Sequence, residues 1–450
     1  MESLNTRPMF SNRALVTLSV PIVIDAVLSI FTGMVDTAMV SSAGEAAVGA
    51  ISLVDQLFLL FVMTFSAIAS GGVVITAQYI GSQNIEKAKS SANQLLYAAT
   101  FMALLITVST IGFIPQILRL IYGSLEDAVF QNAQEYFFYI LLGMPFLAIA
   151  SSCTALLRTM SRSKLAMLLA LGANVLNIIG NAILIYGFKL GAAGAAIATT
   201  FSRIVWAVAT MYFMHRKQLP VHFEKLLRFR FDFDVMGRVL RVGVANGLES
   251  GLFQVGKLLV ASLVSSFGTI AIAANSVANT LCNIGWTIVG SIGTVLLTVV
   301  GQCVGAGETE QARAYTKKLL KLGHLLVFGL FGSVFLLRNQ LVSLFNFGDE
   351  AREAAAYYTG IGAALTIFAL YGNAFLPVSA FRAAGDVRYT VVMAVSTMFL
   401  FRVALSYLLN AVTDWALLCV WLGMFTDWVC RGILNTVHFR KGTWLQKKLI

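Results

Sequence analysis

Long runs of hydrophobic residues recur from end to end of the chain, separated by short polar segments. The runs are continuous and do not alternate with a period of two, so they predict helices and exclude a membrane β-barrel. A span of about 20 apolar residues with its loop takes about 35 residues. The 450 residues therefore predict an all-α polytopic membrane protein of twelve transmembrane helices. The expected spans are 14–40, 46–79, 90–114, 128–152, 164–187, 192–214, 236–264, 270–304, 317–337, 353–377, 389–411 and 415–437.

Charged residues are few and unevenly placed. They make up 12% of the chain, against about 25% in soluble domains, while 58% of residues are apolar. About 24 Lys and Arg lie in the terminal segments and even-numbered loops, and about four lie in the odd-numbered loops. The positive-inside rule then predicts a multi-pass protein of the plasma (inner) membrane with both termini in the cytoplasm. This topology explains the net charge of +11 without a nucleic-acid partner.

The sequence lacks the motifs of enzymes and metal sites. Its five cysteines form no CxxC pair and lie in or beside apolar runs, which indicates packing. Its four histidines form no HExxH or other ligand cluster, and no GxxxxGKS or GxxxxGKT phosphate loop occurs. No set of nucleophile and base stands out. We therefore expect neither an enzyme nor a bound cofactor.

The chain contains two copies of one unit. It aligns with itself without gaps at a single shift, which places Gln78–Gly81 on Gln302–Gly305 and Arg158 on Arg382. Each copy holds six spans, an even number, so the copies are parallel repeats of the kind that enclose a cavity in transporters with two six-helix halves. The predicted parts are an N-terminal lobe (1–215), a basic cytoplasmic linker (216–235) and a C-terminal lobe (236–450).

Ionisable groups inside a span are functional candidates because they are costly to bury. In the first span Asp25, Ser29, Thr32 and Asp36 are spaced 4, 3 and 4 residues apart and share one helix face. Solvation near a helix end, or a pair with Arg203 of the sixth span, is the alternative to a functional role. We take Asp36, Asp25, Thr32 and Arg203 as candidates in the N-terminal lobe.

Asparagines form a second stripe, in the fifth span, at Asn174, Asn177 and Asn181. An asparagine side chain offers both an acceptor and a donor, so it can complete an ion shell begun by a carboxylate or hold a protonated carboxyl group. The alternative is hydrogen bonding between helices that only stabilises the bundle.

The C-terminal lobe carries its own polar residues. Asn246, Glu249 and Lys257 share a face of the seventh span, and Glu249 is the repeat equivalent of Asp25. Glu249 and Lys257 lie about 12 Å apart along the helix, too far for direct contact, so each needs another partner or faces water. The eighth span adds a stripe suited to lining a cavity, namely Asn275, Asn279, Asn283 and Thr287. Further charged residues in the last two spans are Arg402, Asp427 and Arg431, of which the last two are four apart and are expected to pair.

Several of these residues lie in strings that resemble the multidrug and toxic compound extrusion (MATE) family. The strings are Pro21 with Val35-Asp36-Thr37, Ala77-Gln78-x-x-Gly81, Gly243 followed by Glu249, and Arg382-Ala-Ala-Gly385-Asp386. They cover essentially the whole chain in the family's order. The resemblance implies a cation-coupled antiporter with two six-helix lobes in a V, which exports organic cations and other amphipathic compounds against inward H⁺ or Na⁺.

The resemblance also implies roles for single residues. Asp36 matches the first-span carboxylate linked to cation binding, and Asn177 and Asn181 match a fifth-span pair in which some members have Asp at the second position. Asp25 is our conjecture for the missing carboxylate. In the C-terminal lobe Glu249 matches a family carboxylate. The tenth-span Asp of some members has no clear counterpart, and Asn373 is nearest.

The mechanism expected from these residues is cation loading. A proton on Asp36, or Na⁺ held by Asp36, Asn177, Asn181 and Thr32, would let the first span repack against the fifth and weaken cargo binding. The partners are a small cationic or amphipathic substrate and membrane lipid, and we expect a monomer. The alternative is a flippase or exporter of a lipid-linked or anionic substrate, for which a basic cavity would use Arg203, Lys257 and Arg402. An intramembrane enzyme and a non-transporting scaffold are less favoured.

Overall fold

The computed structural model describes residues 8–123, 125–224, 231–345, 348–447 and 449–450. Its helices form two compact units, one of Asn12–Val244 and one of Ala245–Ile450 together with the N-terminal residues up to Ser11. We call them the N-lobe and the C-lobe. The boundary between the two units falls inside helix α9 (Phe233–Ser265). It therefore lies beyond the segment 216–235 that the sequence suggested as the linker. Residues 225–230 of that segment lie outside the described part of the chain.

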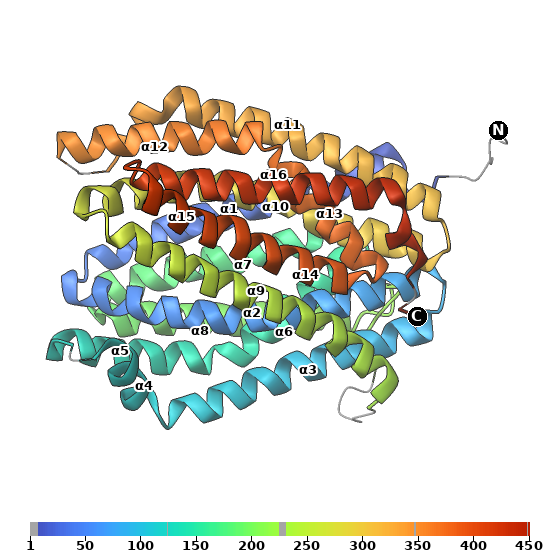
Figure 1. The fold of residues 1–450 in the computed structure, drawn as a ribbon. Coiled ribbons are helices and arrows are strands. Elements are labelled where there is room, and N and C mark those ends of the chain that lie inside the picture. The colour runs from blue at the N-terminus through green and yellow to red at the C-terminus, as the bar shows by residue number, and fades with distance from the viewer. Residues whose placement is uncertain (1–7, 124, 225–230, 346–347, 448) are drawn as a thin grey trace. The chain divides into compact units, whose positions relative to one another are not determined.

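The described residues are almost entirely helical, as expected (Figure 1). The N-lobe contains α1 (Asn12–Ser41), α2 (Glu45–Gly81), α3 (Ile85–Ile111), α4 (Ile114–Tyr122), α5 (Asp127–Leu142), α6 (Met144–Thr159), α7 (Ser163–Asn181), η1 (Ala182–Gly187), α8 (Gly191–Met214) and the start of α9. The C-lobe contains the rest of α9, α10 (Thr269–Gly305), α11 (Thr309–Val342), α12 (Asp349–Phe368), α13 (Tyr371–Ala384), α14 (Val387–Thr397), η2 (Met398–Ala404), α15 (Leu405–Val412), α16 (Leu417–Lys441) and η3 (Thr443–Gln446).

Ten helical segments in the described residues are long and apolar enough to cross a membrane. Two bent pairs, α5 with α6 (45°) and α12 with α13 (56°), bring the number to twelve if each pair is one span. The first bend lies at Gly143, and α6 then has a proline in its first turn. The second lies at Leu370, whose φ of 49° is left-handed. The expected all-α membrane architecture is confirmed, with the fourth and tenth spans broken.

The repeat is visible in the helix boundaries. Helices α2 and α10 both contain 37 residues, and both their first and their last residues are equivalent in the repeat alignment. Each begins directly after a glycine with positive φ, 100° at Gly44 and 90° at Gly268, a conformation that side-chain-bearing residues rarely adopt. The same local chemistry therefore starts the same long helix in both lobes.

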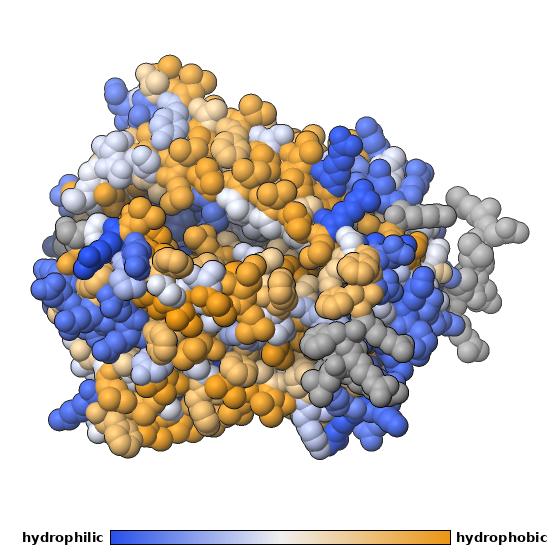
Figure 2. All heavy atoms as spheres, turned by 90° about the horizontal axis from the view of Figure 1, so that it is seen from below, coloured by the Kyte–Doolittle hydropathy of each residue, from blue (hydrophilic) through white to orange (hydrophobic). Residues whose placement is uncertain are grey.

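The side chains on the face drawn in Figure 2 agree with a membrane protein. Hydrophobic side chains cover the middle of this face, and hydrophilic side chains gather at its two ends. Phe101, Val108 and Leu120 are among the large apolar side chains that are mostly exposed. Such exposure is costly in water but favourable against lipid.

In the segment 216–235, Glu224 accepts a hydrogen bond from Lys89 at the start of α3 (3.0 Å) and contacts His222 (2.6 Å). The hydrogen bond from Lys89 lowers the pKa of Glu224, whose carboxylate lies at the surface. This surface contact connects the described end of the linker to α3.

Glycines let α2 and α9 cross closely within the N-lobe. A Cβ added at Gly71 would lie 2.8 Å from the backbone nitrogen of Gly243. Backbone atoms cannot move aside as a flexible side chain can, so we expect Gly71→Val to lower the free energy of unfolding by about 2–3 kcal/mol, measured by denaturant unfolding in micelles. Gly49→Val in the same helix is the control, because no described atom other than its chain neighbours and the nearby backbone of α2 lies within 4 Å of its added Cβ. Equal stability of the two variants would contradict the close crossing.

Candidate functional site

Asp36 on α1 is held by two asparagines of α7. Asn181 Nδ2 donates to Asp36 Oδ1 at 3.0 Å. In the amide orientation that satisfies the neighbours of Asn177, its Nδ2 donates to both carboxylate oxygens of Asp36, at 2.9 and 3.0 Å, while its Oδ1 accepts from Thr199 Oγ1 at 3.0 Å. The four-residue spacing of the asparagines places both amides on the helix face that meets α1.

The two asparagines are almost fully buried, and Asp36 is half-buried. The Oδ1 atom of Asn181 has no hydrogen-bond partner among the described residues. A half-turn of this amide about its Cβ–Cγ bond would exchange the donor facing Asp36 for an acceptor. The site can therefore serve a bare carboxylate in one amide orientation, and a protonated carboxyl group or a bound cation in the other.

Two further N-lobe candidates, Thr32 and Asn174, lie on the same two helices. Thr32 is half-buried, and its hydroxyl donates to the backbone oxygen of Leu28 at 2.9 Å. Asn174, one turn before Asn177, is also half-buried. Thr32 keeps its lone pairs available for a cation, because its hydrogen bond uses only the proton.

A second carboxylate belongs to the N-lobe cluster and is missing from our sequence-based candidates. Tyr136 of α5 donates to Asp55 Oδ1 of α2 at 3.1 Å. The Arg203 guanidinium of α8 lies over the Phe58 ring, 4.6 Å from its centroid, and attracts Asp55 electrostatically. Asp55 could have been found from sequence as an ionisable residue within an apolar run. Tyr136 gives no comparable signal, since tyrosine is common in spans.

The charges of this cluster do not cancel. Asp36 and Asp55 repel each other, and Arg203 is the cation that acts on Asp55. With both carboxylates ionised the three side chains carry a net charge of −1. Uptake of one cation would bring these three side chains to a net charge of zero, which is the state favoured electrostatically in a medium of low polarity.

Asp25 and Glu249 make equivalent ion pairs in the two repeats. Asp25 of α1 pairs with Arg158 of α6, and Glu249 of α9 pairs with Arg382 of α13 at 2.6 Å. The repeat alignment places each member of the first pair on the corresponding member of the second. The carboxylate side chains are each 13% exposed, and the arginines are 21% and 23% exposed. Asp25 thus pairs with Arg158 rather than with the alternative partner Arg203, and lies about 16 Å along α1 from Asp36.

We expect these pairs to support each lobe. Arg382→Gln should lower the free energy of unfolding by about 1–3 kcal/mol, because Glu249 is left mostly buried without its cation. Adding Glu249→Gln should restore part of the loss, giving a measurable coupling in a double-mutant cycle. Arg388→Gln, at an exposed arginine two residues into α14, is the control. Additive effects of the two single changes would show that the pair contributes nothing.

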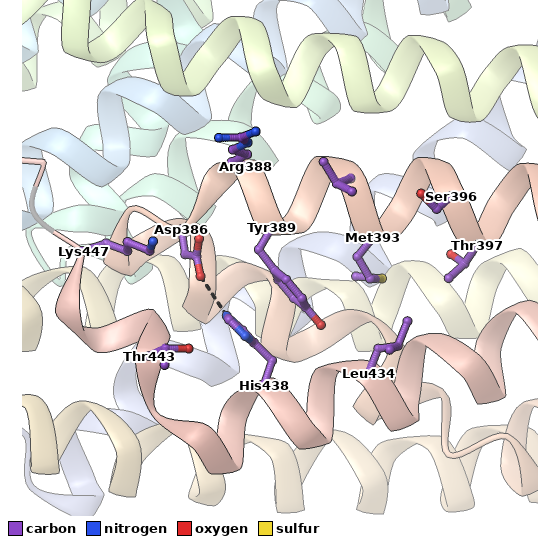
Figure 3. Close-up of a pocket in the computed structure, with 11 residues that line it drawn as sticks. Asp386, Arg388, Tyr389, Met393, Ser396, Thr397, Leu434, His438, Thr443 and Lys447 are labelled. Carbon is purple, nitrogen blue, oxygen red and sulfur yellow. Dashed lines mark hydrogen bonds and ion pairs between the residues drawn. The ribbon is translucent and has the colours of Figure 1, made fainter.

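The string Arg382-Ala-Ala-Gly385-Asp386 has a structural explanation. Gly385, with φ 97°, ends α13, and Asp386 Oδ2 lies 2.7 Å from His438 Nε2 of α16. Figure 3 shows these two side chains pointing toward each other in a pocket, with Tyr389 beside His438. The rings of Tyr389 and His438 are stacked 3.8 Å apart. The string thus connects α13, α14 and α16.

The C-lobe candidates separate into two groups. Lys257, Asn275, Asn279 and Arg402 line one pocket. The others are not among its lining residues: Asn246, Glu249 and Asn373. The amide of Asn435 of α16 donates to the backbone oxygen of Asn373 at 3.3 Å, a contact between helices that does not involve the Asn373 side chain.

The expected pair of Asp427 and Arg431 is confirmed, at 2.7 Å. Arg402 lies against the same carboxylate, at 3.2 Å from its other oxygen. The three side chains form one buried cluster, which sequence spacing alone could not reveal because η2 and α16 are separate in the chain.

The family model described as MatE matches residues 21–183 and again residues 247–408. The chain belongs to the MATE family. It is 27% identical to the uncharacterized transporter YisQ of Bacillus subtilis, over 98% of this chain and 97% of that protein. It is 24% identical to the probable multidrug resistance protein NorM of Thermotoga maritima, over 97% and 94% of the two chains. A crystal structure of MATE in the straight conformation has the same fold, with a TM-score of 0.89 at 20% identity over 97% of each chain.

Membership of the MATE family makes this protein a transporter of the multidrug efflux class with transmembrane helices, as its sequence strings predicted. The model matches twice, once in each repeat. The first stretch contains Asp36 with Asn177 and Asn181, and the second contains Lys257 and Arg402.

Proposed function

We propose that this MATE transporter is a cation-coupled antiporter that exports organic cations and amphipathic drugs by alternating access of its two lobes. The observation that carries the proposal is the Asp36 carboxylate, held by the amides of Asn177 and Asn181 within a cluster of net charge −1. The coupling ion is H⁺ or Na⁺. Both ions suit an acidic oxygen flanked by amides that can present either donors or acceptors.

Cation loading changes the contacts between α1 and α7. While Asp36 is charged, the Nδ2 atoms of both asparagines bind it. A proton or Na⁺ on Asp36 turns at least one amide, so that its oxygen faces the new positive charge. This exchange alters the packing of α1 on α7 and weakens cargo binding, and by reciprocity the cargo weakens cation binding.

The expected setting is the plasma membrane, with both termini in the cytoplasm, lipid around the apolar faces, and a monomer as the working unit. The positive-inside distribution of Lys and Arg supports this orientation. The inward proton or sodium gradient then drives loading from outside, helped by about 2.3 kcal/mol per charge per 100 mV of membrane potential.

Transport in proteoliposomes tests the proposal. We expect efflux of a cationic dye to follow an imposed pH gradient or an imposed Na⁺ gradient, each applied separately. The ion whose gradient drives efflux is the coupling ion. Absence of dye movement under either gradient, with protein shown to be folded, would contradict the proposal.

The second candidate is export of an anionic or lipid-linked substrate. The observation that favours it is the pair of cations, Lys257 and Arg402, lining the C-lobe pocket. A fluorescent anionic amphiphile in the same vesicles separates the candidates, because it should move under the gradient in place of the cationic dye.

A further inference from the structure

A pocket of about 510 Å³ lies within the C-lobe, among α9, α10, η2 and α16. Two of its lining residues are cations, Lys257 and Arg402, and none of those in the described part of the chain is acidic. The amides of Asn275 and Asn279 also line it, and Asn279 Nδ2 donates to both oxygens of Asn275. The pocket therefore combines positive charge with neutral hydrogen-bonding groups.

The lining residue Arg402 shares one carboxylate with Arg431, which is not itself among the lining residues. Asp427 is fully buried, and its two oxygens contact Arg402 and Arg431. Arg402 is 5% exposed, and its Nη2 atom has no hydrogen-bond partner within the described ranges. No carboxylate oxygen of the described residues lies within 4 Å of Lys257 Nζ. The four side chains carry a net charge of +2.

Aromatic rings surround the arginines and leave their charge uncancelled. The Arg402 guanidinium lies 5.2 Å from the Phe253 ring centroid and 5.8 Å from that of Trp428. The Lys257 ammonium lies 5.5 Å from the same Phe253 ring. Cation–π contacts stabilise a cation but carry no net charge, so an anion entering the pocket would still meet two positive groups.

Comparison of the two repeats shows that the net charge around this pocket is positive, whereas the net charge of the equivalent cluster in the N-lobe is negative. The positions that the repeat alignment makes equivalent are Asp36 and Val260, Asp55 and Asn279, and Arg203 and Asp427. Val260 and Asn279 both line the C-lobe pocket. The pocket thus stands at the repeat position of the acidic cluster, with both carboxylates replaced by neutral side chains and Lys257 and Arg402 added.

We propose that the C-lobe pocket binds an anionic group, a carboxylate or a phosphate, so that the two lobes hold sites of opposite charge. Lys257 and the free Nη2 of Arg402 bind the anion directly. The proposal rests on the proposed transport function in one respect: the anionic group is taken to be part of a transported compound, such as an amphiphile that carries one positive and one negative group. The binding itself requires no coupling to an ion gradient.

Equilibrium dialysis of radiolabelled phenyl phosphate against the full-length protein in phosphatidylcholine nanodiscs tests the binding. We expect saturable binding that phenyltrimethylammonium, a cation of similar size, does not displace. Lys257→Gln should weaken the affinity about tenfold or more, the loss expected for one charge-assisted hydrogen bond. Lys257→Arg should retain most of the affinity because it keeps the charge. Lys321→Gln, which removes an exposed lysine of α11 outside the pocket, should leave the affinity unchanged.

The source of the anion is distinguished by competition. Displacement of phenyl phosphate by inorganic phosphate points to a soluble anionic cargo, whereas weaker binding in nanodiscs that contain phosphatidylglycerol points to a lipid headgroup. Non-saturable binding, or equal affinity of wild type and Lys257→Gln, would overturn the proposal. Dye efflux under an imposed gradient tests the coupling mechanism, and dialysis of phenyl phosphate tests the anion site, so failure of the one and failure of the other give different results.

Discussion

Asp36→Asn is expected to reduce gradient-driven export to the background of empty proteoliposomes while leaving the protein folded. Asparagine cannot take up a proton or supply the negative charge that binds Na⁺, so the coupling step is lost. The fold should survive because the side chain keeps its shape, and a turned amide of Asn181 or Asn177 can still hydrogen-bond to it. The initial rate of dye efflux under an imposed gradient measures the effect.

A binding measurement separates coupling from cargo recognition in this variant. Wild-type affinity for the dye should change with pH or Na⁺, and Asp36→Asn should show one affinity under all conditions, as reciprocity requires. Asp414→Asn, at an exposed aspartate before α16, is the matched control and should transport normally. Normal drug export by Asp36→Asn would refute the assignment of Asp36.

Asp427→Asn is expected to produce the largest loss of stability, about 3–5 kcal/mol in the free energy of unfolding. The change keeps the shape of the side chain but leaves Arg402 and Arg431, which are 5% and 3% exposed, without their shared counter-charge. Two buried guanidinium groups then repel each other in a medium of low polarity. Denaturant unfolding in micelles, with melting temperature as a second measure, reports the loss.

The control for this change is an exposed ion pair. Asp349 and Arg352 lie 3.4 Å apart at the start of α12, and the aspartate side chain is fully exposed. Asp349→Asn should alter stability by less than about 1 kcal/mol, since surface pairs contribute little. Equal stability of Asp427→Asn and Asp349→Asn would show that the buried arginines are balanced in another way.

The helical architecture could be predicted from sequence because few backbone conformations are stable within a lipid bilayer. Apolar runs of about 20 residues must form helices, since unpaired backbone groups cannot be satisfied in lipid. The internal repeat predicted matching helices, and α2 and α10 have matching ends. The helix breaks at Gly143 and Leu370 were not predicted, because the hydrophobic runs continue through them.

Pairing between helices was harder to infer. Spacing placed Asn177 and Asn181 on one face of a helix but could not show that this face meets Asp36. Asp427 and Arg431 were paired correctly because both lie on α16, four residues apart. The sequence marks Arg158 only as a position of the repeat, and its pairing with Asp25 depends on how α6 packs near α1.

The sequence by itself determined the membrane class, the duplication and the family, because these depend on composition, period and local strings. Only the tertiary structure decided which charges on different helices neutralise one another. In the structure Tyr136 donates to Asp55, which interacts electrostatically with Arg203, and Asp427 forms ion pairs with both Arg402 and Arg431. The physical reason is that electrostatic energy depends on distances between side chains of different helices, and those distances are set by packing rather than by separation along the chain.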